Sequence, residues 1–292
     1  METMTSTHAP APVLPASLRV GAVELTVTDL DRSAGFYESA IGLRLHRRED
    51  GRAVLGAGGE DLVVLVEDAS ARPAGRHAGL YHFALLHPSR LELARAAQRL
   101  AATRTRISGA SDHGVSEAIY LPDPDHNGIE LAADRGRERW GDLADPTATG
   151  GPEPLDLGGL MQLVEDESPH PHVAPDTVVG HLHLHVGDLD RGLAFYRDAI
   201  GFEAMTLLDS AAFLAAGGYH HHLGINLWRG HGVPPSPAGR VGLRHWTIVL
   251  PAAAATALRE RVIAAGAPYE DRPGGLLVRD PWDIALLVVA EG

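Results

Sequence analysis

Histidine is the residue type in this chain with the most capacity for chemistry. The 292-residue sequence contains 17 His but no Cys, and its 25 basic residues are all Arg. The absence of Cys excludes disulfides, thiolate nucleophiles and thiolate metal ligands, and the absence of Lys excludes Schiff-base chemistry. Imidazole and carboxylate groups are therefore the strongest chemical groups available, and together they are typical ligands of a metal ion.

Strand alternation selects a small set of these groups. Successive side chains of a β-strand point to opposite faces, so a polar residue between apolar ones lies on the face away from the core. Over residues 218–228 the same alternation places His221 with the apolar side chains and His222 on the other face. Applied to all the expected strands, it predicts five residues on the face that no helix covers: His82, Tyr120, Glu130, His181 and His222.

The elements that position these residues belong to an internal repeat. The segment Val20 to Gly42 recurs at Val179 to Gly201, with 13 of 23 positions identical and no gap. A second, shorter pair opens at Gly79 (GLYHFALLHP) and Gly242 (GLRHWTIVLP), and an Asp-Pro turn follows each of these segments. The chain therefore reads as four similar modules, two in each half.

Each module predicts a strand, an amphipathic helix and then two or three further strands. In the first module an alternating strand around Val23 precedes a helix over Asp31 to Ile41, with Asp29 or Asp31 as its N-cap and Gly42 as its stop. In the second, a helix is expected over Leu91 to Ala102. Four such β-α-β-β-β modules predict an α+β protein with two curved mixed sheets, whose helices cover one face while the other curls around a cavity.

Composition and length indicate the partners, domains and location to expect. At a net charge of −13 a phosphate- or nucleic-acid-binding surface is not expected. We expect a disordered tail over 1–17, a first domain over 18–135, a linker with one short helix over 136–177, and a second domain over 178–292. The expected location is the cytoplasm, because the sequence predicts neither a signal sequence nor an apolar run of membrane-spanning length.

Several of these motifs together resemble a known superfamily. The pattern DLDRxxxFYxxxIG, the segment GLYHFALL and the closing DPDHNGIEL are similar to the vicinal oxygen chelate superfamily, which includes glyoxalases, bleomycin-resistance proteins and extradiol dioxygenases. The further segments GHLHLHV and GGYHHHLGINLW resemble the bacterial catechol-2,3-dioxygenase-like group, over nearly the whole chain beyond residue 18. The resemblance implies paired β-α-β-β-β modules and a metal site.

The superfamily pattern also implies which residues bind the metal. Its ligands are a His on the first strand of a module and a Glu on the last, and in neither half of this chain is that set complete. The first half has Ala22 in place of a His, and the second has Leu287 in place of the carboxylate. If the second module pairs with the third, however, His82, Glu130 and His181 form a complete set. That pairing is a hypothesis at this stage.

The same resemblance implies an activity. It assigns Tyr120 to substrate contact and His222 to acid–base chemistry, with His113 as a further candidate and His245 without a role. The expected protein is an extradiol dioxygenase that cleaves a catechol-type diol with O2 on Fe(II), or alternatively Mn(II). A glyoxalase-like metal-dependent isomerase or lyase and a metal-free small-molecule binding protein are the alternatives. No nucleic acid or membrane partner is expected, and a homo-oligomer is left open.

Overall fold

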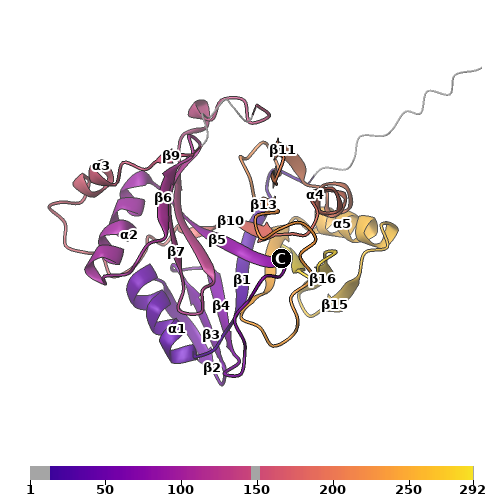
Figure 1. Cartoon of the computed structure of the whole chain (residues 1–292), viewed down its shortest axis with the longest axis horizontal. Coiled ribbons are helices and arrows are strands. Elements are labelled where there is room, and N and C mark those ends of the chain that lie inside the picture. Colours follow the sequence, from indigo (N-terminus) through magenta and orange to yellow (C-terminus); the bar gives the residue numbers. More distant parts are fainter. Residues whose placement is uncertain (1–13, 146–151, 292) are drawn as a thin grey trace, which may run out of the picture.

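The computed structural model describes residues 14–145 and 152–291 (Figure 1). Most of the tail expected over 1–17 therefore lies outside the described residues. Leu14 belongs to that expected tail, yet it is buried and its amide donates a hydrogen bond to the carbonyl of Gly201. Among the described residues, no helix is both long enough and apolar enough to cross a membrane.

Two mixed sheets form the frame of the molecule, as the sequence predicts. The first has eight strands in the order β15 (Tyr269–Arg272), β16 (Gly275–Arg279), β17 (Ala285–Ala290), β14 (Gly242–Leu250), β1 (Arg19–Val27), β4 (Asp61–Glu67), β3 (Arg52–Gly56) and β2 (Arg44–Glu49). The second has nine, in the order β11 (Glu203–Leu208), β12 (Ala211–Ala215), β13 (Leu223–Asn226), β10 (Val178–His185), β5 (Gly79–His87), β8 (Gly128–Asp134), β7 (Ser116–Pro122), β6 (Gly109–Asp112) and β9 (Glu153–Pro154).

Each sheet takes one module from each half of the chain. Module 1 (β1–β4) joins module 4 (β14–β17) through the antiparallel pair β1–β14. Module 2 (β5–β8) joins module 3 (β10–β13) through the antiparallel pair β5–β10 (Figure 1). This arrangement confirms the pairing of the second and third modules, so the sheets do not follow the division of the chain into halves.

The helices follow the first strand of each module and pack on the outer faces of the sheets (Figure 1). They are α1 (Leu30–Phe36) with a π-helical turn η1 (Tyr37–Ile41), α2 (Arg90–Ala102), α4 (Leu189–Leu193) with η3 (Ala194–Ile200), and α5 (Ala252–Ala264). The connecting segment adds a 3-10 turn η2 (Arg137–Arg139), β9 and the short helix α3 (Leu157–Gln162), which the sequence predicts.

The ends of the first helix match the sequence signals. Asp29 is its N-cap, because its side chain accepts a hydrogen bond from the amide of Arg32 at 2.9 Å. Gly42 ends the π-helical turn in the left-handed region at φ +87°, where glycine carries no steric penalty. The sequence predicts one α-helix up to Ile41, whereas the structure has a π-helical turn over Tyr37–Ile41.

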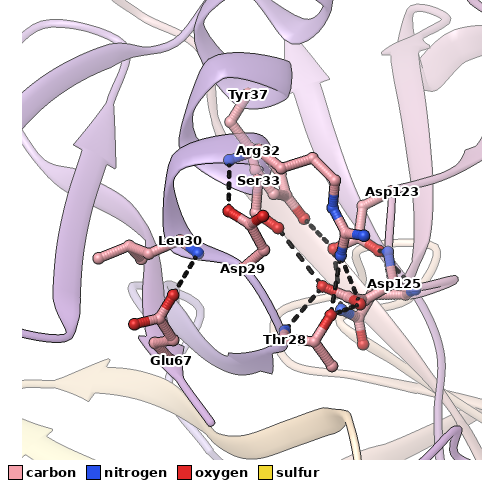
Figure 2. Close-up of polar contacts among 10 residues, drawn as sticks. Thr28, Asp29, Leu30, Arg32, Ser33, Tyr37, Glu67, Asp123 and Asp125 are labelled. Carbon is pink, nitrogen blue, oxygen red and sulfur yellow. Dashed lines mark hydrogen bonds and ion pairs between the residues drawn. The ribbon is translucent and has the colours of Figure 1, made fainter. Parts of the chain in front are cut away.

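Contacts between a helix and a distant turn hold consecutive modules together (Figure 2). The buried hydroxyl of Tyr37 donates to Asp123 at 3.2 Å, and Asp125 accepts hydrogen bonds from the backbone and hydroxyl of Thr28. The second half repeats the first of these contacts, since the Tyr196 hydroxyl donates to Asp280 at 2.9 Å. The repeated Phe-Tyr and Asp-Pro motifs therefore serve the fold.

Candidate metal centre

Three adjacent strands bring His82, Glu130 and His181 together. Strand β5 lies between β8 and β10, and Ala84 on β5 pairs with Glu130 on one side and with His181 on the other. His82 stands two positions before Ala84, on the same face of the same strand. The small side chain of Ala84 therefore leaves the space above it to the three larger polar groups.

The three side chains converge on one carboxylate oxygen. Glu130 Oε2 lies 2.9 Å from Nε2 of His82 and 3.2 Å from Nε2 of His181. One ligand atom from each residue lies within 4.8 Å of the other two, and all three residues are buried. Among the described residues this is the one group of at least three His, Asp or Glu side chains with such a geometry.

The electrostatics favour the protonation states that a metal needs. Burial lowers the pKa of His82, so its imidazole is neutral and has a lone pair to offer. Burial acts to raise the pKa of Glu130, but the neighbouring imidazoles, that of His181 first, outweigh it and hold that pKa well below its usual range. Nε2 of His82 lies 2.9 Å from Glu130 Oε2 without the geometry of a hydrogen bond, so this buried nitrogen has no hydrogen-bond partner. Two imidazoles and an ionised carboxylate are a donor set that fits a divalent metal.

Tyr120 and His113 lie beside this triad. Tyr120 on β7 pairs directly with Glu130 on β8, and its ring centroid is 5.5 Å from that of His82. The Tyr120 hydroxyl is 2.7 Å from Nε2 of His113. Burial, reinforced by the charge of Glu130, raises the pKa of Tyr120 far above its usual value, so the phenol keeps its proton.

The three consecutive histidines 220–222 differ from the strand prediction. Strand β13 begins only at Leu223, so the alternation expected over 218–228 does not extend to them. His221, expected among apolar side chains, has its ring centroid 4.1 Å from that of His181. His222 instead packs on Tyr219, at 4.7 Å between centroids, and its Nδ1 accepts the amide of Ala216 at 3.2 Å.

A short chain of polar contacts continues from His221. Nδ1 of His221 is 2.8 Å from Nδ1 of His220, and Nε2 of His220 is 2.9 Å from Asp134. Alternation carried through the turn before β13 placed His221 among apolar side chains, which is why no role was predicted for it. The Gly217-Gly218 pair, with both residues at positive φ, is the signal that could have placed the start of the strand later.

The corresponding face of the other sheet has a different composition. His245 occupies the position of His82, but its Nδ1 is 3.7 Å from the side chain of Glu24. Glu24 forms ion pairs with Arg52 at 2.8 Å and with Arg244 at 2.9 Å. A carboxylate held by two guanidinium groups is not free to bind a metal. His245 therefore has no available carboxylate beside it, and it lies in the other sheet from the triad.

Comparison with known proteins agrees with this architecture. The model of the glyoxalase/bleomycin resistance protein/dioxygenase superfamily matches residues 19–131 and 178–283. The chain belongs to this superfamily. The membership expected from the sequence motifs is thereby confirmed, and the two matched segments contain all three residues of the triad.

Individual proteins are also similar to the chain. It is 39% identical over 284 residues to the catechol-2,3-dioxygenase of Bacillus subtilis (strain 168), covering 95% of this chain and 96% of the relative. Among solved structures, glyoxalase I from Zea mays is 20% identical with a TM-score of 0.59, over 94% of this chain and 92% of that one. The cppA protein of Streptococcus pneumoniae TIGR4 is 13% identical with a TM-score of 0.58, over 94% and 100%. At such identities the structural likeness concerns the fold alone.

Proposed function

We propose that the protein is a metal-dependent extradiol dioxygenase, which cleaves the ring of a catechol-type diol with O2. The observation that carries the proposal is the buried His82–Glu130–His181 triad, in a chain 39% identical to a catechol-2,3-dioxygenase over nearly its full length. The three residues are the proposed metal ligands. Fe(II) is the proposed metal and Mn(II) the alternative, because both accept imidazole and carboxylate ligands.

A divalent metal held by His82, Glu130 and His181 would bind the two vicinal oxygens of the diol and lower the pKa of their protons. The contribution of the protein is to hold these three ligands rigidly. Three hydrogen-bonded strands fix the ligand backbones, and the burial of all three side chains keeps competing water away from them.

Tyr120 is the proposed substrate contact, and His113 positions it. The His113 ring lies within hydrogen-bond distance of the phenol, which keeps its proton because its pKa is raised. A protonated phenol donates a hydrogen bond to a negatively charged substrate oxygen, and such charge-assisted bonds are stronger than neutral ones. We therefore expect the Tyr120 hydroxyl to orient the substrate by a hydrogen bond to one of its two oxygens.

His222 is the proposed acid–base residue, and its contacts define which proton it can move. Its Nδ1 accepts a backbone N–H, so in the neutral ring the proton resides on Nε2. Burial lowers the pKa of His222 to about 4, which keeps the ring neutral at pH 7. In this neutral form His222 donates a hydrogen bond through its Nε2–H to a negatively charged oxygen, and it takes up a proton only at Nδ1, once that atom releases the amide of Ala216. His221, nearer to His181, is expected to support the position of that ligand.

Oxygen consumption tests the proposed function. Protein loaded anaerobically with Fe(II) is mixed with catechol in air-saturated buffer, while O2 and the yellow ring-opened product are followed together. We expect one O2 consumed for each ring opened. The Glu130→Gln variant should lose activity, while Glu117→Gln, a buried Glu of the same sheet paired with Arg90, should retain it. Turnover of a hemithioacetal without O2 uptake, or no turnover, would contradict the proposal.

A further inference from the structure

The surroundings of the triad contain a group of aromatic side chains that the proposed mechanism does not use. Tyr81 precedes the ligand His82, yet both rings lie on the same side of β5, with centroids 4.8 Å apart. The cause is a β-bulge. His82 pairs with His183 and Leu80 pairs with Leu184, so that Tyr81 has no opposite residue and turns toward the triad.

Trp228 extends this group outward from the metal site. Its ring centroid lies 5.3 Å from Tyr81 in an edge-to-face arrangement and 5.0 Å from His183. The indole N–H donates to Ser210 and the backbone amide donates to Asn226, so the ring is held in position. Trp228 is nevertheless 51% exposed and Tyr81 is 39% exposed. We name Tyr81, His183 and Trp228 the aromatic surface.

The internal repeat provides a comparison for these positions. The strand registers of the two sheets align Tyr81 with Arg244 and Trp228 with Asp68, and they align His183 with Glu24. Arg244 forms an ion pair with Glu24 at 2.9 Å, and Asp68 accepts hydrogen bonds from Ser70, so the three corresponding positions carry charged side chains.

Since the same fold carries a charged set in one sheet and an aromatic set in the other, the fold does not require the aromatic side chains. The aromatic side chains occur in the sheet that contains the triad, and charged side chains take their places in the sheet without it. This difference points to a role in ligand binding.

The glycine at position 224 leaves space for the ring of His183 in the aromatic surface. A side chain at Gly224 would come within 2.8 Å of the His183 ring, whereas the corresponding position in the other sheet is Val64. Nε2 of His183 is buried and has no hydrogen-bond partner, so a polar atom faces the site unused. Partly exposed aromatic rings beside an unsatisfied imidazole are typical of a surface that binds an apolar ring next to a polar group.

We propose that Tyr81, His183 and Trp228 bind the ring substituent of the substrate, and that the protein therefore prefers a catechol with an apolar, aryl or bulky alkyl substituent to catechol itself. This inference rests on the proposed function for the identity of the diol. Tyr81 lies against the ligand His82, so we expect a bare catechol bound at the triad to reach it. The ring of Trp228 packs on Tyr81 and His183 and not on a ligand, so we expect it to contact only a substituent.

Two measurements on iron-loaded protein test the inference. The first compares kcat/KM for 3-phenylcatechol and for catechol, in the wild type and in Trp228→Ala. We expect the variant to lose about tenfold on 3-phenylcatechol and less than about threefold on catechol, the difference corresponding to one aromatic contact. Leu207→Ala is the matched control, because Leu207 is also 51% exposed but lies on the edge strand β11, outside the aromatic surface. Equal losses on both substrates would overturn the inference.

The second measurement does not depend on turnover. Binding of 2-phenylphenol and of phenol, each with one hydroxyl, is measured anaerobically by titration calorimetry. Tighter binding of 2-phenylphenol, weakened about tenfold in Trp228→Ala and unchanged in Leu207→Ala, supports the inference. Equal affinity for the two phenols, or no binding of 2-phenylphenol, overturns it. If no catechol is cleaved, the proposed function fails, while the binding result still decides the role of the aromatic surface.

Discussion

Nε2 of His181 lies 3.2 Å from Oε2 of Glu130, although the two residues belong to different halves of the chain and are 51 positions apart. The contact exists because β10 and β8 lie on either side of β5 in one sheet. The chemical centre of the protein is thus assembled between its second and third modules. The first and fourth modules form a sheet of the same design, but its corresponding face holds the Glu24 ion pairs.

Removal of the Tyr120 hydroxyl should reduce turnover without loss of metal. Tyr120→Phe deletes the proposed donor to the substrate oxygen and leaves His113 without its partner at 2.7 Å. We expect kcat/KM to fall by about 10- to 100-fold, which is the usual effect of losing one charge-assisted hydrogen bond. Steady-state kinetics together with metal analysis measure both quantities. Tyr269→Phe, an exposed Tyr in the other sheet, is the control, and equal kinetics in the two variants would refute the role of Tyr120.

The two buried tyrosines that join helices to turns should contribute similarly to stability. Tyr37→Phe leaves Asp123 without one donor, and Tyr196→Phe does the same to Asp280. Each loss should lower the free energy of unfolding by about 1–2 kcal/mol, as for other buried hydrogen bonds. Because the two sites share no partner, the double variant should show the sum. Urea denaturation monitored by circular dichroism gives these values, and unchanged midpoints would exclude the role of these contacts in the fold.

Asp280 should make the fold less stable as the pH rises. Burial, partly offset by amide and Tyr196 hydrogen bonds, raises the pKa of Asp280 to about 6, from 3.8 in the unfolded chain. Between these two values the unfolded state has already lost the proton that the folded state retains, so the free energy of unfolding falls with increasing pH. From pH 4 to pH 7 the wild type should lose about 2 kcal/mol relative to Asp280→Asn.

Unfolding of the two proteins at several pH values measures this difference. The exposed Asp209→Asn variant serves as the control for a carboxyl group without burial. An Asp280→Asn difference that is independent of pH would show that the folded-state pKa of Asp280 is not raised.

Much of the fold could be predicted from the sequence because each repeat has the same order of strand, helix and turn signals. The aligned segments at Val20 and Val179 predict matching strand and helix pairs, and Asp29 and Gly42 mark the ends of the first helix as the structure has them. The triad could be predicted for a related reason. His82, Glu130 and His181 all lie inside regular strands, where alternation fixes the direction of a side chain.

Prediction failed where the strands are irregular. Strict alternation would place Tyr81 on the face opposite to its neighbour His82, but a β-bulge turns it to the same face. The bulge arises from the register with β10 and leaves no pattern in the local sequence. His221 and His222 precede β13 in a turn, where direction depends on contacts with His181 and Tyr219 rather than on periodicity. Both errors concern residues around the triad, because side chains there come from bulges and turns as well as from strands.

A single metal site that joins the two halves of the chain is the central feature of the proposed enzyme. Anaerobic Fe(II) titration followed by metal analysis, on the wild type and on two matched variants, tests it. We predict one iron per chain in the wild type and in His245→Ala, and less than about 0.1 in His181→Ala, since a binding site that loses one of three protein ligands loses most of its affinity. Full iron content in His181→Ala, or loss of iron in His245→Ala, would contradict the account.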